Sequence, residues 1–392
     1  MKRISFSNLI VGSMCMFFVL TLSGCQRVQD GYQVIDVDFN ATNYKAGIID
    51  SLFQYDHHII LEETDLSRIT SISKAIITDD EILILDNWKR LLVFDRNGRF
   101  MKGMDKTGHG KGEYIKLSDF DIKGDSVFVL DQRGNKILIY GSDFQFLSSM
   151  EVRPAKDLAV MDGGIALNHD FGLADGKDSN NYSYSFHANG QYAYMLPFHS
   201  RLRGRSFTFS GADHCFYEYG DSLFCFFPYN DMVYYVASDG KLHDYLQIRI
   251  NNTRDRSIKP NMPFKAVEEI LQSDTPSNIF SFCRCQDLII FSYFGKEDTR
   301  IETIYSTRQG LLYNGPVGLD SNGMPVSIAS YINRSTERQY LLSMVNPEAM
   351  RFFYNKRKGN ENYPILNNIG TNLGSNGNPA LIFYKIRDER TQ

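Results

Sequence analysis

A short strand–turn–strand unit that recurs along the chain limits the fold more than any other feature of the sequence. Within the stretch from Glu81 to Tyr140, apolar runs at 81–86 and 91–95 are followed by a second pair at 127–131 and 136–140. Short apolar runs separated by Asp, Asn and Gly are typical of strands joined by tight turns. The sequence therefore predicts an all-β fold built from repeated hairpins.

The spacing of the units indicates how they assemble. Five equivalent positions, each just before a turn, lie 46, 46, 50 and 69 residues apart; they are Phe94, Tyr140, Phe186, Val236 and Tyr305. Units of about 40 to 50 residues with four short strands are typical of propeller blades, which bury their faces only against one another. Five units and one blade completed by both chain ends predict a six-bladed β-propeller of four-stranded blades, while residues 313–386 leave room for a seventh.

The irregular parts of the chain give three further expectations. Apolar residues at helical spacing within 260–274 account for the long step before Tyr305 and predict a short helix inserted between blades. A second helix is expected at 347–354, followed by a Gly- and Asn-rich loop at 367–379. An alternating strand at 32–38 is expected to pair beside the final strand and close the ring.

The N-terminus carries a secretory signal. Lys2 and Arg3 precede an apolar run at 9–20, which is too short for a stable membrane span. The following Leu22-Ser23-Gly24-Cys25 closely resembles the lipobox of bacterial lipoproteins, in which the cysteine is lipidated and becomes the first mature residue. A plain signal peptide with a free cysteine is the alternative.

These features predict a lipoprotein signal peptide at 1–24, a lipidated N-terminus, linker and closing strand at 25–48, and a single propeller domain at 49–388. Acyl chains on Cys25 would hold the protein on the membrane. Residues 26–30 lack the acidic cluster linked with surface display. The sequence therefore favours an outer-membrane lipoprotein that faces the periplasm.

Composition and motifs argue against several functional classes. The net charge of −4 offers no basic surface for nucleic acid. The sequence has no Gly-x-Ser-x-Gly element, and its eight histidines form neither His-x-His nor His-Glu-x-x-His. No metal, cofactor or catalytic nucleophile is therefore expected.

The two pairs of cysteines lead to different predictions. Cys215 and Cys225 flank a segment with Gly220-Asp221 at its middle, so a hairpin there would bring them across from each other and permit a disulfide in an oxidising compartment. Cys283 and Cys285 share one face of a strand without a second pair of zinc ligands, which favours free thiols in the core.

Four segments together resemble the six-bladed β-propeller lipoproteins of Bacteroides and relatives, a group similar to NHL-repeat propellers. They are residues 94–100, the glycine-rich 108–114, 120–122, and 377–385 with its Asn-Pro pair. The sequence departs from the family at Lys111, where proline is usual, and at 377–378, where an acidic residue often precedes Asn-Pro. The resemblance implies export, lipid anchoring and a propeller, and it carries over no catalytic residue.

The glycine-rich segment has a structural and a functional interpretation. Gly108, Gly110 and Gly112 match neither a dinucleotide-binding nor a Walker pattern, and no helical pattern follows them. A turn between blades, with glycines for positive φ and Glu113 and Tyr114 as braces, is the favoured interpretation.

The enzymatic alternative is a metal-dependent hydrolase of lactonase type that uses the central channel. Such an enzyme needs carboxylates and amides that converge on a metal. Candidates at the ends of the innermost strands are Asp119, Asp121, Asp157, Asn168, His169, Asp170, Asp213 and His214. Each of these is more often a turn or strand-end residue than a ligand.

A binding function has better support from the sequence. Tyrosines crowd the third and fourth blades, and those near loops could stack on sugars or anchor a protein. The candidate ligand-binding residues are His169, Asp170, Tyr182, Tyr184 and Tyr229, with blade packing as the structural interpretation of the tyrosines. The sequence therefore favours a scaffold or recognition module for an unknown protein or glycan.

Overall fold

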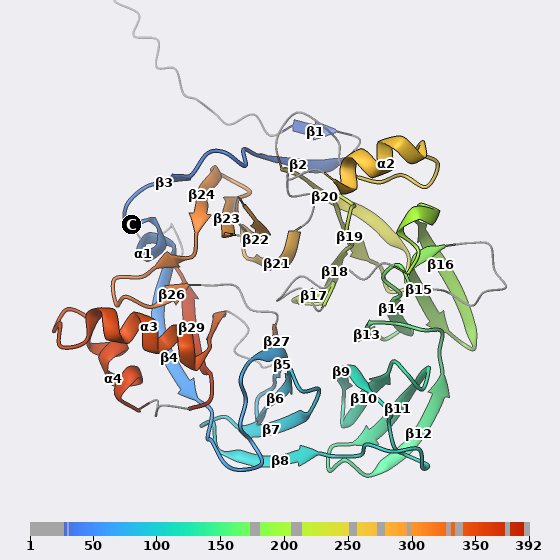
Figure 1. The fold of residues 1–392 in the computed structure, drawn as a ribbon, viewed down its shortest axis with the longest axis horizontal. Coiled ribbons are helices and arrows are strands. Elements are labelled where there is room, and N and C mark those ends of the chain that lie inside the picture. The colour runs from blue at the N-terminus through green and yellow to red at the C-terminus, as the bar shows by residue number, and fades with distance from the viewer. Residues whose placement is uncertain are drawn as a thin grey trace, which may run out of the picture.

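Six β-sheets stand in a ring around a central axis in the computed structural model of the chain (Figure 1). The structure describes residues 31–172, 181–204, 214–250, 257–272, 279–295, 299–326, 340–372 and 377–387, together with the backbone of 27–29 and 331–333. The prediction of a six-bladed propeller is confirmed, and the alternative of seven blades is wrong.

The first five blades are regular, each with four antiparallel strands in chain order from the axis outwards. The first three contain β5 (Ile72–Ile77), β6 (Glu81–Asp86), β7 (Leu91–Asp95) and β8 (Phe100–Met104); β9 (Leu117–Lys123), β10 (Ser126–Asp131), β11 (Lys136–Gly141) and β12 (Phe146–Glu151); and β13 (Asp157–Val160), β14 (Ile165–Asn168), β15 (Tyr182–Ala188) and β16 (Gln191–Pro197). The next two contain β17 (Phe216–Tyr219), β18 (Ser222–Phe226), β19 (Met232–Val236) and β20 (Leu242–Ile250); and β21 (Ile279–Cys285), β22 (Leu288–Phe294), β23 (Arg300–Ser306) and β24 (Gly310–Pro316).

The sixth blade closes the ring with strands from both chain ends. Here β28 (Tyr340–Val345) pairs with β29 (Ala380–Ile386), and β29 pairs with the N-terminal β4 (Phe53–Ile60). The short hairpin of β25 (Gly318–Leu319) and β26 (Pro325–Val326) lies beside β28.

The prediction of which N-terminal strand closes the ring is wrong. Residues 32–37 form β2 (Tyr32–Val37), which pairs in parallel with the outer edge of β20 in the fourth blade. That edge is nine residues long, and Ile35 and Val37 become buried in the core between the fourth and fifth blades. By contrast, β4 comes directly before β5 of the first blade in the chain, so it can pair with β29 without a long connection. Two other short strands, β1 (Arg27–Gln29) and β3 (Asn43–Tyr44), extend the outer edges of β2 and β24.

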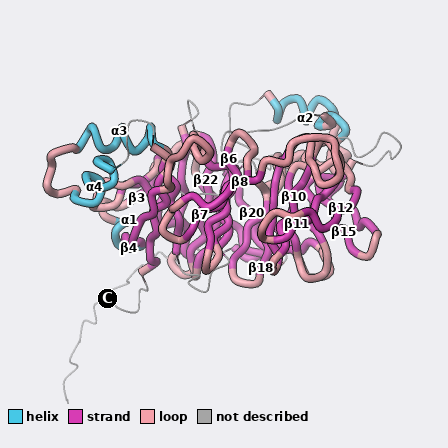
Figure 2. Tube along the Cα trace, turned by 90° about the horizontal axis from the view of Figure 1, so that it is seen from below, coloured by secondary structure: helices cyan, strands magenta, loops and turns pink. Residues whose placement is uncertain are grey.

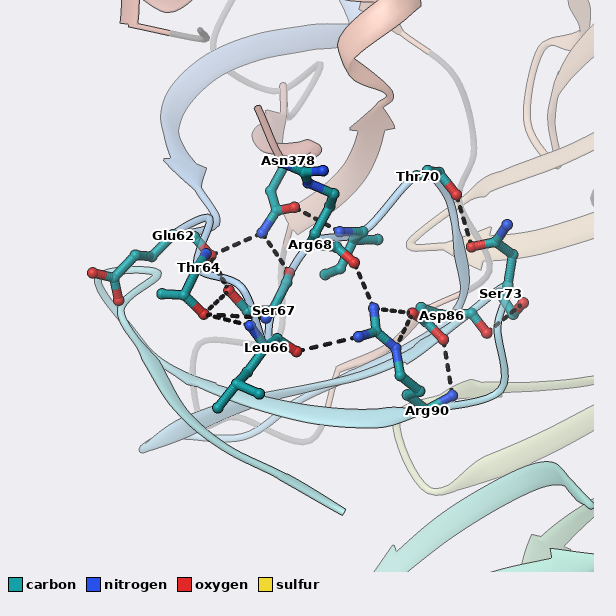
Figure 3. A network of polar contacts seen from close by, with 12 residues as sticks. Glu62, Thr64, Leu66, Ser67, Arg68, Thr70, Ser73, Asp86, Arg90 and Asn378 are labelled. Atoms are coloured by element: carbon teal, nitrogen blue, oxygen red, sulfur yellow. Dashed lines mark hydrogen bonds and ion pairs between the residues drawn. The ribbon is translucent and has the colours of Figure 1, made fainter. Parts of the chain in front are cut away.

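A polar network fastens the closing blade to the first blade (Figure 3). The Asn378 side chain accepts a hydrogen bond from the Ile69 N–H and donates to the carbonyls of Glu62 and Ser67. The Arg90 guanidinium donates to Asp86 and to backbone carbonyls of the same connection. The Asn-Pro segment of the family resemblance therefore has a structural role at the seam.

The helices are short and lie outside the sheets. The inserted helix α2 (Phe264–Leu271) is confirmed, and so is α3 (Pro347–Arg357). The loop expected at 367–379 is wrong in its first part, where α4 (Pro364–Asn372) buries Leu366 and Ile369 at helical spacing against the sixth blade. The remaining elements are α1 (Ile48–Leu52) and the 3₁₀ turn η1 (Ser200–Leu202). None of the described helices has the length and apolar character needed to span a bilayer.

The disc has two different faces. We call hairpin face the side formed by the turns that join first to second and third to fourth strands, such as 124–125, 161–164 and 237–240. We call helix face the opposite side, which carries α2, α3, α4 and the connections 61–71 and 87–90 (Figure 2). Near the axis, β27 (Tyr331–Asn333) pairs in parallel with β5 and approaches β17.

Candidate functional site

A pocket of about 550 Å³ opens at the hairpin face beside the axis. Its wall is made by the end of β5 and by hairpin turns of the second, third and fourth blades, represented by Thr78, Gly124, Asp162 and Asp221. These turns are 38 or more residues apart in the chain and meet because the inner strands converge on the axis. Ligand pockets in proteins commonly have volumes of about 300–1,000 Å³.

The pocket has a polar rim with a negative balance and an apolar lower wall. Lys123 is its basic residue and contacts Asp162, with Nζ 2.6 Å from Oδ1; this pair lowers the pKa of Asp162. Glu218 and Asp221 add two carboxylates from the fourth blade. The apolar and hydroxyl-bearing lining residues are Thr78, Ile122, Val160, Met161, Ser222, Leu223, Tyr235, Val236 and Ser238.

A buried polar hub lies among the innermost strands. Lys74 is almost fully buried, and its Nζ donates to both oxygens of Asp119, at 3.0 and 3.2 Å, and to the carbonyl of Phe120. Burial by itself would lower the pKa of Lys74, but the Asp119 and Asp121 carboxylates raise it above the usual value. Burial would likewise raise the pKa of Asp119, and the charges of Lys74 and His214 instead hold it well below its usual range.

The hub carboxylates also link successive blades. Asp119 Oδ2 accepts the Leu158 N–H at 2.9 Å, and Asp157 Oδ2 accepts the Cys215 N–H at 2.7 Å. Asp121 Oδ2 does the same for the Val160 N–H at 2.6 Å. An innermost strand exposes one edge of unpaired backbone N–H groups, and a carboxylate from the preceding blade satisfies them here.

Two residues of the hub, Asp157 and His214, are less well compensated by hydrogen bonds or opposite charges. Burial and the neighbouring Asp119 raise the pKa of Asp157. The His214 ring is buried with Nδ1 3.4 Å from Asp119 Oδ1, and neither ring nitrogen has a hydrogen-bond partner within the described part of the chain. Asp213, the other residue of this predicted pair, lies outside the described residues.

The structure does not bring the hydrolase candidates together as a metal site. The three aspartates of the hub already bind Lys74 or backbone N–H groups; they are Asp119, Asp121 and Asp157. Asn168 lies at the opposite end of its strand from the pocket and accepts the Asp170 N–H. Across the residues that the structure describes, no group of three or more His, Cys, Asp or Glu side chains is arranged to hold a metal ion.

The predicted ligand-binding residues lie apart from the pocket. His169 is buried, with Nδ1 2.6 Å from the Pro154 carbonyl and Nε2 2.7 Å from Ser185 Oγ. Asp170 follows it in a left-handed conformation at φ 50° and is also buried. None of the five predicted residues lines the pocket.

The tyrosines among them act mainly in packing. Tyr184 is fully buried between the third and fourth blades, and its hydroxyl donates to the Gly240 carbonyl. Tyr182 stacks on Tyr194, which stacks on Tyr192, with ring centroids 5.7 Å apart in both pairs. Tyr194 is thus stacked between the two other rings, which gives all three a packing role on the third blade. Half-buried Tyr229 packs near α2.

The glycine-rich segment forms the turn between the first two blades. Gly112 has φ 78°, and a Cβ there would lie 2.7 Å from the Phe146 ring. Gly108 and Gly110 instead leave room for the Glu113 carboxylate, which accepts the Gly110 N–H at 2.7 Å. The segment therefore serves structure, with one of the three glycines in the left-handed region.

The described cysteines are free thiols. The strand register places Phe216, not Cys215, opposite Cys225, so the predicted disulfide is not formed. Burial raises the pKa of both thiols well above the usual value. Cys283 and Cys285 are also free, as expected, and Cys25 lies outside the described residues.

The pocket was missed by sequence reasoning. Its lining residues are ordinary turn residues such as Gly124 and Asp221, which resemble those of every other hairpin in the chain. The signal that could have found them is their shared place after the innermost strand of successive blades.

Comparison with known proteins gives a family and a fold. The family model described as a domain of unknown function, DUF4934, matches residues 33–385. A putative exported protein from Bacteroides fragilis has a solved structure that is similar with a TM-score of 0.70 at 18% identity, covering 91% of this chain and all of that one. A member of the DUF4221 family from Bacteroides vulgatus matches with a TM-score of 0.47 at 8% identity, covering 86% of this chain and 97% of that one. No curated protein matches.

Proposed function

The chain belongs to the DUF4934 family, and from this membership and the fold we propose that it is an exported, lipid-anchored propeller that binds a protein or glycan ligand in the pocket of the hairpin face. The pocket is the observation that carries the proposal. A pocket beside the axis with a mixed polar and apolar lining is the kind of site in which proteins hold a ligand.

The charges of the pocket rim limit the classes of ligand that it favours. The lining includes three carboxylates, Asp162, Glu218 and Asp221, and one ammonium, Lys123, which leaves an excess of two negative charges. Carboxylates accept hydrogen bonds from hydroxyl and amine donors and repel anions. The rim therefore favours a neutral polyhydroxylated or amine-bearing ligand over a phosphorylated or sulfated one.

Two observations support export and anchoring. The signal ends in the lipobox-like segment 22–25, and the structurally similar Bacteroides fragilis protein is described as exported. A lipid on Cys25 would place the propeller at the outer membrane, and the residues that follow favour the leaflet facing the periplasm.

Co-purification with a matched pair of variants tests the binding proposal. Wild-type protein is recovered from detergent-solubilised envelope beside the pocket variant Glu218→Gln/Asp221→Asn and the control Glu63→Gln/Asp65→Asn on the helix face. Both variants remove two carboxylates that lie near each other in sequence. We expect the wild type and the control to retain the same glycan or protein and the pocket variant to lose it. Equal recovery with all three, or no retained material with the wild type, would reject the pocket as the binding site.

A further inference from the structure

We propose that the helix face docks on the lipid bilayer while the hairpin face and its pocket point away from it. This inference rests on the lipid anchor of the proposed function and adds an orientation to it. The partner of the helix face is thus a membrane surface.

The anchor has almost no linker. β1 begins at Arg27, and two residue steps separate Arg27 from Cys25. An extended chain spans at most about 3.3–3.6 Å per residue, so the lipidated residue stays within about 7 Å of the strand. Since β1 is paired with β2, and β2 with the fourth blade, the rim of the disc must lie close to the bilayer.

The strand register decides which face the anchor leaves from. β2 is parallel to β20, so Val37 lies beside Ile250 at the helix-face end. β1 is antiparallel to β2, with Gln29 opposite Tyr32 and Arg27 opposite Val34. Followed back from Gln29 to Arg27, β1 therefore runs towards the helix face.

Exposed apolar side chains are distributed unevenly between the two faces. Among the described residues, seven large apolar side chains are exposed, and three of them lie on outer strands. The other four lie in connections, and all four connections belong to the helix face: Leu66 is 70% exposed, Trp88 54%, Phe264 57% and Phe352 59%. Single exposed apolar residues are common on soluble proteins, but their confinement to the face from which the anchor leaves needs a cause.

Three of these residues are aromatic, and each has a cation over its ring. The Arg90 guanidinium lies 4.8 Å from the Trp88 ring centre, and Lys356 Nζ lies 5.4 Å from that of Phe352. Arg201 lies over Phe264 in the same way. Aromatic rings favour the headgroup region of a bilayer. Arg90 is bound to Asp86 and Arg201 to Glu268, so among these three cations it is Lys356 that is suited to a lipid phosphate. The combination fits a lipid interface better than it fits a purely apolar protein partner.

The single tryptophan of the chain makes the orientation measurable. Trp88 is the only Trp. The acylated full-length protein is reconstituted into vesicles of phosphatidylethanolamine and phosphatidylglycerol with brominated acyl chains, and quenching of the indole fluorescence is recorded. The control is Trp88→Phe combined with Asp125→Trp, which moves the reporter to an exposed turn of the hairpin face. A third protein, Trp88→Phe with Phe264→Trp, places the reporter on α2 of the helix face.

We expect the reporters at 88 and 264 to be quenched several-fold more than the reporter at 125. Equal quenching at all three positions, stronger quenching at 125, or quenching at 264 alone would overturn the orientation. Mass spectrometry of the N-terminal peptide separates the two proposals. Vesicle-bound, acylated protein whose Trp88 is not quenched contradicts the orientation alone, whereas an unmodified Cys25 contradicts the anchor and the orientation together.

Discussion

Asn378 and Ile69 lie 309 residues apart in the chain, and the Ile69 N–H donates a 2.7 Å hydrogen bond to Asn378 Oδ1. The same side chain donates from Nδ2 to the Glu62 and Ser67 carbonyls, each at 2.8 Å (Figure 3). The amide is buried and uses its donor and acceptor groups on one connection. A single residue thus joins the last strand of the chain to the entrance of the first blade.

Asn378→Asp is expected to weaken the seam. The substitution keeps the acceptor for Ile69 and turns the two donors into a carboxylate oxygen that faces carbonyls. Because buried unsatisfied groups cost about 1–3 kcal/mol each, the free energy of unfolding should fall by about 2–5 kcal/mol. Denaturant titration measures the loss, and Asn97→Asp in an exposed turn is the control, with a change below about 0.5 kcal/mol. Equal effects of the two substitutions would show that the seam does not depend on this amide.

Two isosteric substitutions in the hub should have different effects on stability. Asp119→Asn removes the carboxylate that pairs with buried Lys74, and an uncompensated buried charge costs about 3–5 kcal/mol. Asp157→Asn keeps an acceptor for the Cys215 N–H and removes a charge whose burial raises its pKa, so stability at neutral pH should be unchanged or higher. Denaturant titration of both variants checks the order; a larger loss from Asp157→Asn would contradict the description of the hub.

The pH dependence of these variants should differ in sign. The pKa of Asp119 is lowered on folding, so its stabilising contribution is present above the ordinary value of 3.8 and is lost as the pH falls towards the folded value. The pKa of Asp157 is raised, so its contribution is present below 3.8 and is lost as the pH rises through the folded value. The deficit of Asp119→Asn relative to wild type should shrink on acidification. The advantage of Asp157→Asn should grow from acid to neutral pH; parallel curves for the three proteins would contradict both assignments.

Gly112→Ala and Gly190→Ala separate backbone strain from steric overlap. Both glycines have φ near 75°, where an L-residue costs about 1–2 kcal/mol. A Cβ at 190 would meet nothing within 4 Å, whereas at 112 it would overlap the Phe146 ring. Overpacking adds about 1–3 kcal/mol, so Gly112→Ala should lose that much more stability than Gly190→Ala. Thermal and denaturant unfolding measure the difference, and equal losses would place the cost in φ alone.

The blades were predictable from the sequence because each buries nearly continuous apolar strands between neighbours. The closing strand β4 was not, because its centre is Asp56-His57-His58 and its side chains are mostly half-buried, so it lacks the apolar signal of the other strands. Chain order and the alternating pattern made β2 look like the better candidate, although only the free edge of β20 decides its place.

The hub and the pocket differ in how visible they are in the sequence. Asp119, Asp121 and Asp157 were singled out as polar residues on innermost strands, yet their partners lie on other blades and follow only from the closed ring. Lys74 stands alone within the apolar run 72–77, which is a signal of a buried ion pair that sequence reasoning did not use. The pocket depends on turns brought together by the ring, and no local pattern marks it.

Hydrogen–deuterium exchange of the wild-type protein, with and without the material that it retains from solubilised envelope, tests the binding site most directly. We expect slower exchange in the pocket turns around 122–124, 160–162 and 218–223 and no change in the connections of the helix face. Protection confined to the helix face, or no protection at those turns, would contradict a ligand site on the hairpin face.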